Sequence, residues 1–63
     1  MTATETREWI VKSLIRDLGV ANTTNDIQPM FEALEQDQLT RTMQHLRDRG
    51  EIVRVAPGTH RLA

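Results

Sequence analysis

Apolar side chains recur at three- and four-residue spacing in three separate stretches of the chain, which is the pattern of amphipathic helices. The first stretch predicts a helix over residues 5–18. Thr2 and Glu5 fit the capping-box pattern at its start, and Gly19 fits a C-terminal cap. Trp9 shares the helical spacing, so we expect it in the core rather than as an exposed interface anchor. The predicted apolar face comprises Trp9, Ile10, Leu14, Ile15 and Leu18, with Val11 at its edge.

The second stretch predicts a helix over residues 27–35, after a polar connector over residues 20–25. Asp26 is the preferred N-cap, with Asn25 or Thr24 as alternatives, and Pro29 then lies in the first turn, where its missing N–H costs little. No helix breaker separates this stretch from the next, so one long kinked helix over residues 27–49 is the alternative. The predicted buried stripe is Ile27, Met30, Phe31 and Leu34.

The third stretch predicts a helix over residues 38–49, with Asp37 as a possible N-cap and Gly50 as its end. Its core positions are Leu39, Met43 and Leu46. The residues that follow have strand composition on both sides of Pro57-Gly58, a pair typical of a type II turn. They predict a hairpin over residues 51–62, with Ile52 pointing inward and Leu62 closing the sheet against the helices. An isolated hairpin is marginally stable, so it must pack on the helices.

The composition of the 63-residue chain limits the classes of function. With no cysteine, disulfides and thiolate zinc sites are excluded, and two histidines are too few for a metal site, so we expect no metal and no cofactor. No apolar run is long enough for a membrane span, and the first residues lack the features of a secretory signal. These observations favour an intracellular, cytoplasmic protein. No motif for catalysis is present, so we do not expect an enzyme.

The charge is unevenly distributed along the chain, although its net value is only −1. Residues 1–37 hold three basic and seven acidic side chains, for a net charge of −4. Residues 38–63 hold five basic and two acidic side chains, for a net charge of +3. Because binding responds to the local field near the contact, the positive half can approach nucleic acid despite the overall balance.

The order of helix, helix, helix, glycine and hairpin resembles the winged helix-turn-helix superfamily of small DNA-binding domains. The resemblance covers about residues 5–63. It implies one domain over residues 1–63, mainly α with a small β-hairpin (α+β), in which the helix over 38–49 enters a DNA groove and the hairpin is a wing beside it. The residues that carry the resemblance are Leu39-x-x-x-Met43-x-x-Leu46-x-x-x-Gly50-x-Ile52-x-Arg54.

The resemblance also implies which side chains would contact double-stranded DNA. Arg41, Gln44 and His45 lie on the side of the third helix opposite its core positions, and Arg and Gln can read guanine and adenine respectively. Thr40 and Thr42 can bind phosphate or a thymine methyl group. Arg47 and Arg49 are explained by the helix dipole alone. The predicted DNA-binding residues are Gln38, Thr40, Arg41, Gln44 and His45 on the helix, and Arg54, His60 and Arg61 on the wing.

Two hypotheses of function follow. The first is a sequence-specific DNA-binding protein, a small transcriptional regulator of bacterial, phage or plasmid type. Its few basic side chains imply weak binding by a monomer, so we expect a homodimer. The alternative is a winged-helix protein–protein interaction module, an adaptor or decoy that does not bind DNA. The acidic first helix would supply the dimer or partner surface.

Overall fold

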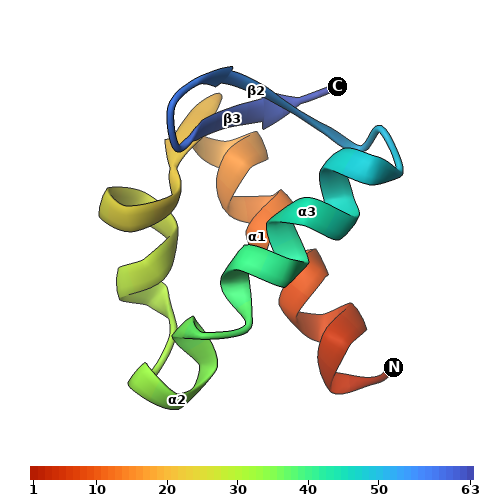
Figure 1. Ribbon diagram of the computed structural model, residues 1–63, viewed down its shortest axis with the longest axis vertical. Helices are drawn as coiled ribbons and strands as arrows, with labels where there is room; N and C mark the ends of the chain where they lie inside the picture. Colours follow the sequence, from red (N-terminus) through yellow and green to blue (C-terminus); the bar gives the residue numbers. More distant parts are fainter.

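Eight short elements follow one another in the computed structural model, which describes residues 1–63 (Figure 1). Helix α1 crosses α3, and the strands lie across one end of both helices, while residues 23–36 run along one side. The protein therefore has an α+β, winged-helix-like fold. The elements are α1 (Ala3–Leu18), β1 (Val20–Asn22), the π-helical turn η1 (Thr23–Ile27), the 3₁₀ turn η2 (Gln28–Met30), α2 (Ala33–Gln36), α3 (Leu39–Asp48), β2 (Ile52–Ala56) and β3 (Thr59–Leu62).

Helix α1 begins two residues before the predicted start, and the predicted capping box is confirmed. The Glu5 amide donates to the Thr2 hydroxyl and the Thr2 amide donates to the Glu5 carboxylate, both at 3.1 Å. Val11 and Ile15 are fully buried, whereas Trp9 is 61% exposed. The prediction that Trp9 belongs to the core is wrong, because Trp9 lies roughly 120–160° around the helix from these two residues. The buried face is centred on Val11, which the sequence placed at the edge.

The prediction of a continuous helix over residues 27–35 is wrong, and so is the alternative of a single helix over 27–49. Pro29 stands in a first turn, where its missing N–H costs little, but this turn is 3₁₀, with the Phe31 amide donating to the Gln28 carbonyl at 3.1 Å. Phe31 and Glu32 then adopt extended backbone before the single turn of α2. The half-buried Gln36 amide donates to the carbonyls of Gln28 and Phe31, which ties α2 back to η2.

Only part of the stripe predicted for this segment is buried. Ile27 and Phe31 enter the core, whereas Met30 and Leu34 are exposed, Leu34 by 90%. The preferred N-cap is also wrong. Asn22 caps the η1 turn by accepting from the amides of Thr24 and Asn25, and the Asp26 carboxylate accepts from the Asn22 amide at 2.7 Å. The segment is therefore held both by local polar contacts and by the burial of Ile27 and Phe31.

The predicted hairpin is present, and a third strand joins it. The sheet is antiparallel in the order β1-β3-β2, so β3 is its central strand. Strand β1 is a correction to the predicted polar connector over residues 20–25, because three residues with mixed polarity carry no strand pattern of their own. Gly58 occupies the turn with φ of 72°, as a type II turn requires, and the register between β2 and β3 shifts near Arg54 and Ala56.

One apolar core joins the helices to the sheet. Leu39, Met43 and Leu46 of α3 are buried as predicted, Ile52 points inward, and Leu62 packs partly against them. No helix of this fold combines the length and the apolarity that a membrane crossing demands. The core consists of Val11, Ile15, Ala21, Ile27, Phe31, Leu39, Met43, Leu46 and Ile52.

Candidate nucleic-acid interface

The outer surface of α3 carries the side chains that the sequence predicts for base contact. Arg41, Gln44 and His45 are all exposed, and so are Gln38 and Thr40 near the start of the helix. The helix begins at Leu39, and Gln38 occupies the N-cap position without a side-chain capping bond, so the prediction of Asp37 as N-cap is wrong.

Thr42 belongs to the interior and is a further correction. It is 2% exposed, and its hydroxyl donates to the Gln38 carbonyl at 2.9 Å. A hydroxyl used in this way cannot bind phosphate, and the methyl group beside it is equally covered. The exposed polar side chains at the start of α3 therefore include Gln38, Thr40, Arg41 and Gln44.

A cleft of about 140 Å³ separates α3 from the hairpin, and we call it the α3–wing cleft. The η1 turn is held against the hairpin, because the Thr23 amide donates to the Gly58 carbonyl at 2.8 Å and the Asn22 amide group donates to the Thr59 hydroxyl at 3.3 Å. Gly58 lies so close to Asn22 that a Cβ there would be 3.4 Å from the Asn22 side-chain nitrogen. The cleft is lined by Thr23, Thr40, Met43, Arg47, Arg54, Gly58 and His60.

His60 is not a wing cation, which corrects the sequence prediction. Its side chain is buried, with an exposed fraction of 2%. Burial lowers the pKa of His60 below its ordinary value, and the positive charges of Arg47 and Arg54 lower it further. The ring is therefore neutral at pH 7.

The neutral His60 ring positions Arg47. The His60 Nε2 atom lies 3.1 Å from the Arg47 guanidinium, and a guanidinium can only donate, so Nε2 accepts and the ring proton is on Nδ1. The buried Nδ1 has no hydrogen-bond partner in the protein. An acceptor at Nε2 keeps the half-buried Arg47 side chain at the cleft.

Arg54 and Arg61 lie on opposite faces of the sheet. Arg54 is opposite His60 in the register, on the face toward α3, and it lines the α3–wing cleft. Arg61 is opposite Val53 and Val20, on the outer face, and its guanidinium donates to the Leu62 carbonyl at 3.0 Å. The structure therefore separates two arginines that the sequence prediction grouped.

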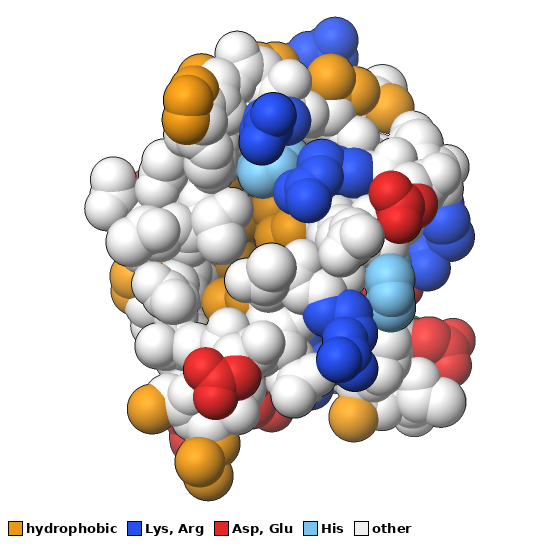
Figure 2. Space-filling view, in the orientation of Figure 1, with side chains coloured by type: hydrophobic (Ala, Val, Ile, Leu, Met, Phe, Trp, Pro, Cys, Tyr) orange, Lys and Arg blue, Asp and Glu red, His pale blue; other side chains and the backbone are white.

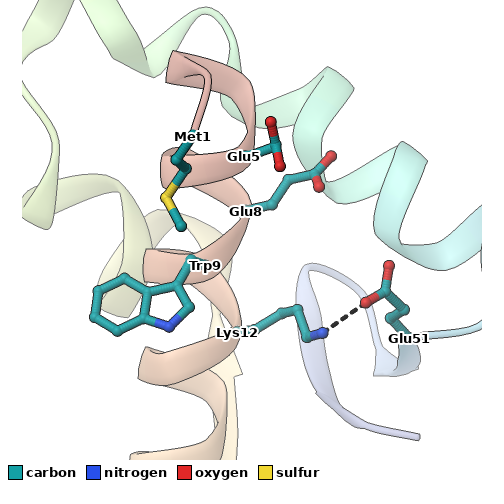
Figure 3. Close-up of a pocket in the computed structure, with 6 residues that line it drawn as sticks. All are labelled: Met1, Glu5, Glu8, Trp9, Lys12 and Glu51. Carbon is teal, nitrogen blue, oxygen red and sulfur yellow. Dashed lines mark hydrogen bonds and ion pairs between the residues drawn. The ribbon is translucent and has the colours of Figure 1, made fainter.

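An ion-pair network holds the start of α1 to the turn after α3. The Arg49 guanidinium contacts Glu8 and Glu51, each at 2.7 Å. Lys12 contacts Glu51 at 2.5 Å (Figure 3). The hydrogen bonds from Lys12 and Arg49 lower the pKa of Glu51. Arg49 and Lys12 are thus neutralised within the protein and contribute little to a field outside it.

Three arginines without carboxylate partners remain on the side of α3 and the cleft: Arg41, Arg47 and Arg54. Figure 2 shows Lys and Arg side chains gathered over α3 and the hairpin on this face, among only scattered acidic side chains. Sequence reasoning assigned Arg47 to the helix dipole and missed its place in the cleft. A helical wheel places Arg47 within about 40° of Met43 and Thr40, the residues that line the cleft with it.

Comparison with protein-family models, with curated proteins and with solved structures returns no match for this chain.

Proposed function

We propose that this protein binds double-stranded DNA in a sequence-specific manner, as a small transcriptional regulator of bacterial, phage or plasmid type. The observation that carries the proposal is the convergence of Arg41, Arg47 and Arg54 on one side of the molecule, each without a carboxylate partner. In the proposed complex α3 enters the major groove and the hairpin lies beside it, as in the winged helix-turn-helix superfamily that the sequence resembles.

Base recognition is assigned to the first two turns of α3. Arg41 can donate two hydrogen bonds to guanine, and Gln44 can pair with adenine in the same bidentate way. His45 follows on the same exposed surface. Asp48 in the last turn repels phosphate, so the N-terminal end of α3 is the end that approaches the groove.

Contact with the phosphate backbone of the DNA is assigned to the α3–wing cleft. Its volume of about 140 Å³ is too small for a base pair but accommodates a phosphate group. The cations Arg47 and Arg54 and the hydroxyls of Thr23 and Thr40 line it, and these groups are typical phosphate ligands. Such contacts fix the orientation of the protein on the duplex and carry no sequence information themselves.

The small number of cations sets the expected affinity. Two phosphate-neutralising side chains, Arg47 and Arg54, give a weak and only moderately salt-sensitive interaction for one copy. The acidic first half of the chain cannot face phosphate, so a second copy on an adjacent half-site is the simplest way to raise the affinity. A regulator of this type would act in the cytoplasm, on the nucleoid.

Selection from a randomised duplex library at low salt tests the proposal. Enrichment of a short shared sequence is the expected result, and Arg41→Ala should relax the preference at one base while Arg47→Ala weakens binding to all sequences. A library that retains no duplex above background at low salt would exclude the proposal.

The second candidate is a protein-interaction module that does not use DNA. The exposure of Trp9 and the acidity of the first half favour it, because an exposed tryptophan is a common anchor of protein interfaces. A stoichiometric protein complex that survives Arg47→Ala and Arg54→Ala would support this candidate. A protein that forms no such complex and binds duplex DNA would exclude it.

A further inference from the structure

The outer surface of α1 carries the largest exposed apolar side chain of the protein. Trp9 is 61% exposed and Met1 is 87% exposed. Figure 3 shows both side chains pointing to the same side of α1, away from the carboxylate of Glu51. They border a hollow of about 230 Å³ that Glu5, Glu8 and Lys12 also line. Tryptophan is among the residues most enriched at protein–protein contacts, so this surface is a candidate for one.

The charges around Trp9 are arranged in a self-complementary order. Glu5, Trp9 and Arg16 fall within an arc of about 40° on the helix, with the acid toward the N-terminus and the base toward the C-terminus. Lys12 lies about 20° outside this arc, and its charge is paired with Glu51 of its own chain. If a second α1 packs antiparallel on the first, Glu5 of each copy lies opposite Arg16 of the other. A two-fold axis produces both ion pairs at once, because each copy offers the same stripe to the other.

The spacing along the helix also suits the tryptophans. Glu5 and Arg16 are separated by about 16 Å along the axis, so the two-fold axis passes midway between them. Trp9 of each copy then lies about 2 Å from that midpoint, on opposite sides, and the two rings are offset by about 4.5 Å. Offset stacking of aromatic rings requires a separation of roughly this size.

The groups that would form these pairs are accessible in the single chain. The Arg16 side chain is 64% exposed, and its contact to Asp17 is long, at 3.4 Å. Glu5 uses its Oε1 atom in the capping box, and its other carboxylate oxygen has no partner within the protein. The ion pairs therefore form without breaking an interaction that stabilises the fold.

A second apolar surface lies on the outer face of the sheet, but its charges are not self-complementary. Val20 and Val53 are exposed there on either side of Arg61 in the register. Two copies packed face to face through this surface would bring their Arg61 side chains together, and like charges oppose such an arrangement. The charge pattern thus favours α1 over the sheet as the contact between copies.

We propose that the occupant of the α1 surface is a second copy of this chain, in an antiparallel two-fold dimer centred on Trp9. The inference does not depend on DNA binding. Helix α1 is about 24 Å long. A contact along this one helix buries less surface than the roughly 1,200–2,000 Å² that a standard stable interface buries. The dissociation constant of the dimer should therefore be micromolar or higher.

Sedimentation equilibrium over a range from about 1 µM to 1 mM, with no DNA present, tests the dimer. We expect concentration-dependent dimerisation by the wild-type protein, and a dissociation constant at least about thirtyfold higher for Trp9→Ala. Leu34→Ala is the matched control, because it truncates an apolar side chain that is 90% exposed and far from α1 in sequence, and it should leave dimerisation unchanged. Circular dichroism of each variant verifies that it is folded.

Charge exchange tests the antiparallel geometry independently of Trp9. Glu5→Arg and Arg16→Glu should each weaken self-association by about tenfold, because each creates two like-charge contacts. An equimolar mixture of the two variants should form a heterodimer, since both contacts then become attractive. Glu5→Gln retains the capping box and separates loss of charge from loss of the cap.

Three outcomes would overturn the proposal. The first is a monomer at every concentration tested. The second is a dimer that Trp9→Ala leaves intact, and the third is a mixture of the exchanged variants that associates no better than either variant alone.

Discussion

Replacing Arg54 with alanine should reduce the salt dependence of DNA binding, whereas replacing Arg61 with alanine should leave it unchanged. The two arginines are on neighbouring strands of the same hairpin and are both exposed. They differ in the face of the sheet that they occupy, since Arg54 shares the face of His60 and Arg61 shares the face of Val53. Arg61→Ala is therefore a matched control for charge, composition and distance along the chain.

The size of the expected change in salt dependence follows from the number of cations that line the α3–wing cleft. Each neutralised phosphate contributes about −0.9 to the slope of log K against log salt concentration. Arg47 and Arg54 together give a slope of roughly −1.8 for one bound copy, and removal of Arg54 leaves roughly −0.9. Between 50 and 200 mM salt, the affinity of the wild-type protein should fall about 12-fold and that of Arg54→Ala about 3.5-fold.

Fluorescence anisotropy of a labelled duplex, titrated at four or more salt concentrations, measures these slopes. The duplex should be short enough to bind a single copy, so that dimerisation does not change the count of contacts. Equal slopes for Arg54→Ala and wild type would refute the assignment of the α3–wing cleft to phosphate. A reduced slope for Arg61→Ala would refute the choice of sheet face.

Three further predictions concern stability and can be measured by chemical or thermal unfolding. Leu46→Ala removes a fully buried side chain from α3 and should cost about 2–5 kcal/mol, whereas Leu34→Ala should change stability by less than about 0.5 kcal/mol; similar losses would contradict the assigned core. Thr2→Ala removes the capping box of α1 and should cost about 1 kcal/mol, while Thr2→Ser retains stability; an unchanged midpoint for the alanine variant would count against the cap. The pKa of His60 is lower in the folded protein than its ordinary value of 6.5, so the unfolded chain takes up the proton first. The stability contributed by neutral His60 should be fully present above about pH 6.5 and decrease as the pH falls below it, by at most about 1.4 kcal/mol per pH unit, and His60→Gln should remove this dependence; a His60→Gln variant with the wild-type pH profile would show that another group is responsible.

The sequence predicts the two long helices well because each has both a periodic face and a recognisable end. The capping box at Thr2 and Glu5 and the glycines at positions 19 and 50, with φ of 81° and 74°, mark ends that local chemistry determines. Helix α3 differs from its predicted range by one residue at each end. The buried positions of α3 and the hairpin turn at Gly58 are likewise local properties of the sequence.

The failures of prediction arise where tertiary contacts decide the outcome. Strand β1 exists because β3 offers it a hydrogen-bonding partner about forty residues later, and nothing in its own three residues indicates a strand. The face of α1 that is buried depends on where the sheet and α3 pack, so the spacing of Trp9 alone could not decide its exposure. The apolar spacing after Asp26 favoured a continuous helix, but the backbone becomes extended at Phe31, and of the four apolar residues only Ile27 and Phe31 enter the core.

The candidate site also has one part that the sequence predicts and another part that depends on tertiary contacts. The exposed residues of α3 were predictable, since a helical wheel gives the side opposite the core without knowledge of the fold. The α3–wing cleft was not predictable, because it forms between α3 and the hairpin. The register of the hairpin places Arg54 on the face toward the cleft and Arg61 on the opposite face. The burial of His60 also follows from that register, which pairs it with Ala21 on the inner face of the sheet.

Nuclear magnetic resonance of the ¹⁵N-labelled protein, titrated with a duplex from the library selection, tests whether α3 and the α3–wing cleft form a DNA-binding surface. We expect chemical-shift changes in α3, at Thr23 and around Arg54 and Gly58, with little change at Val53 and Arg61. Changes confined to the outer face of the sheet, or no changes at a saturating concentration of duplex, would contradict it.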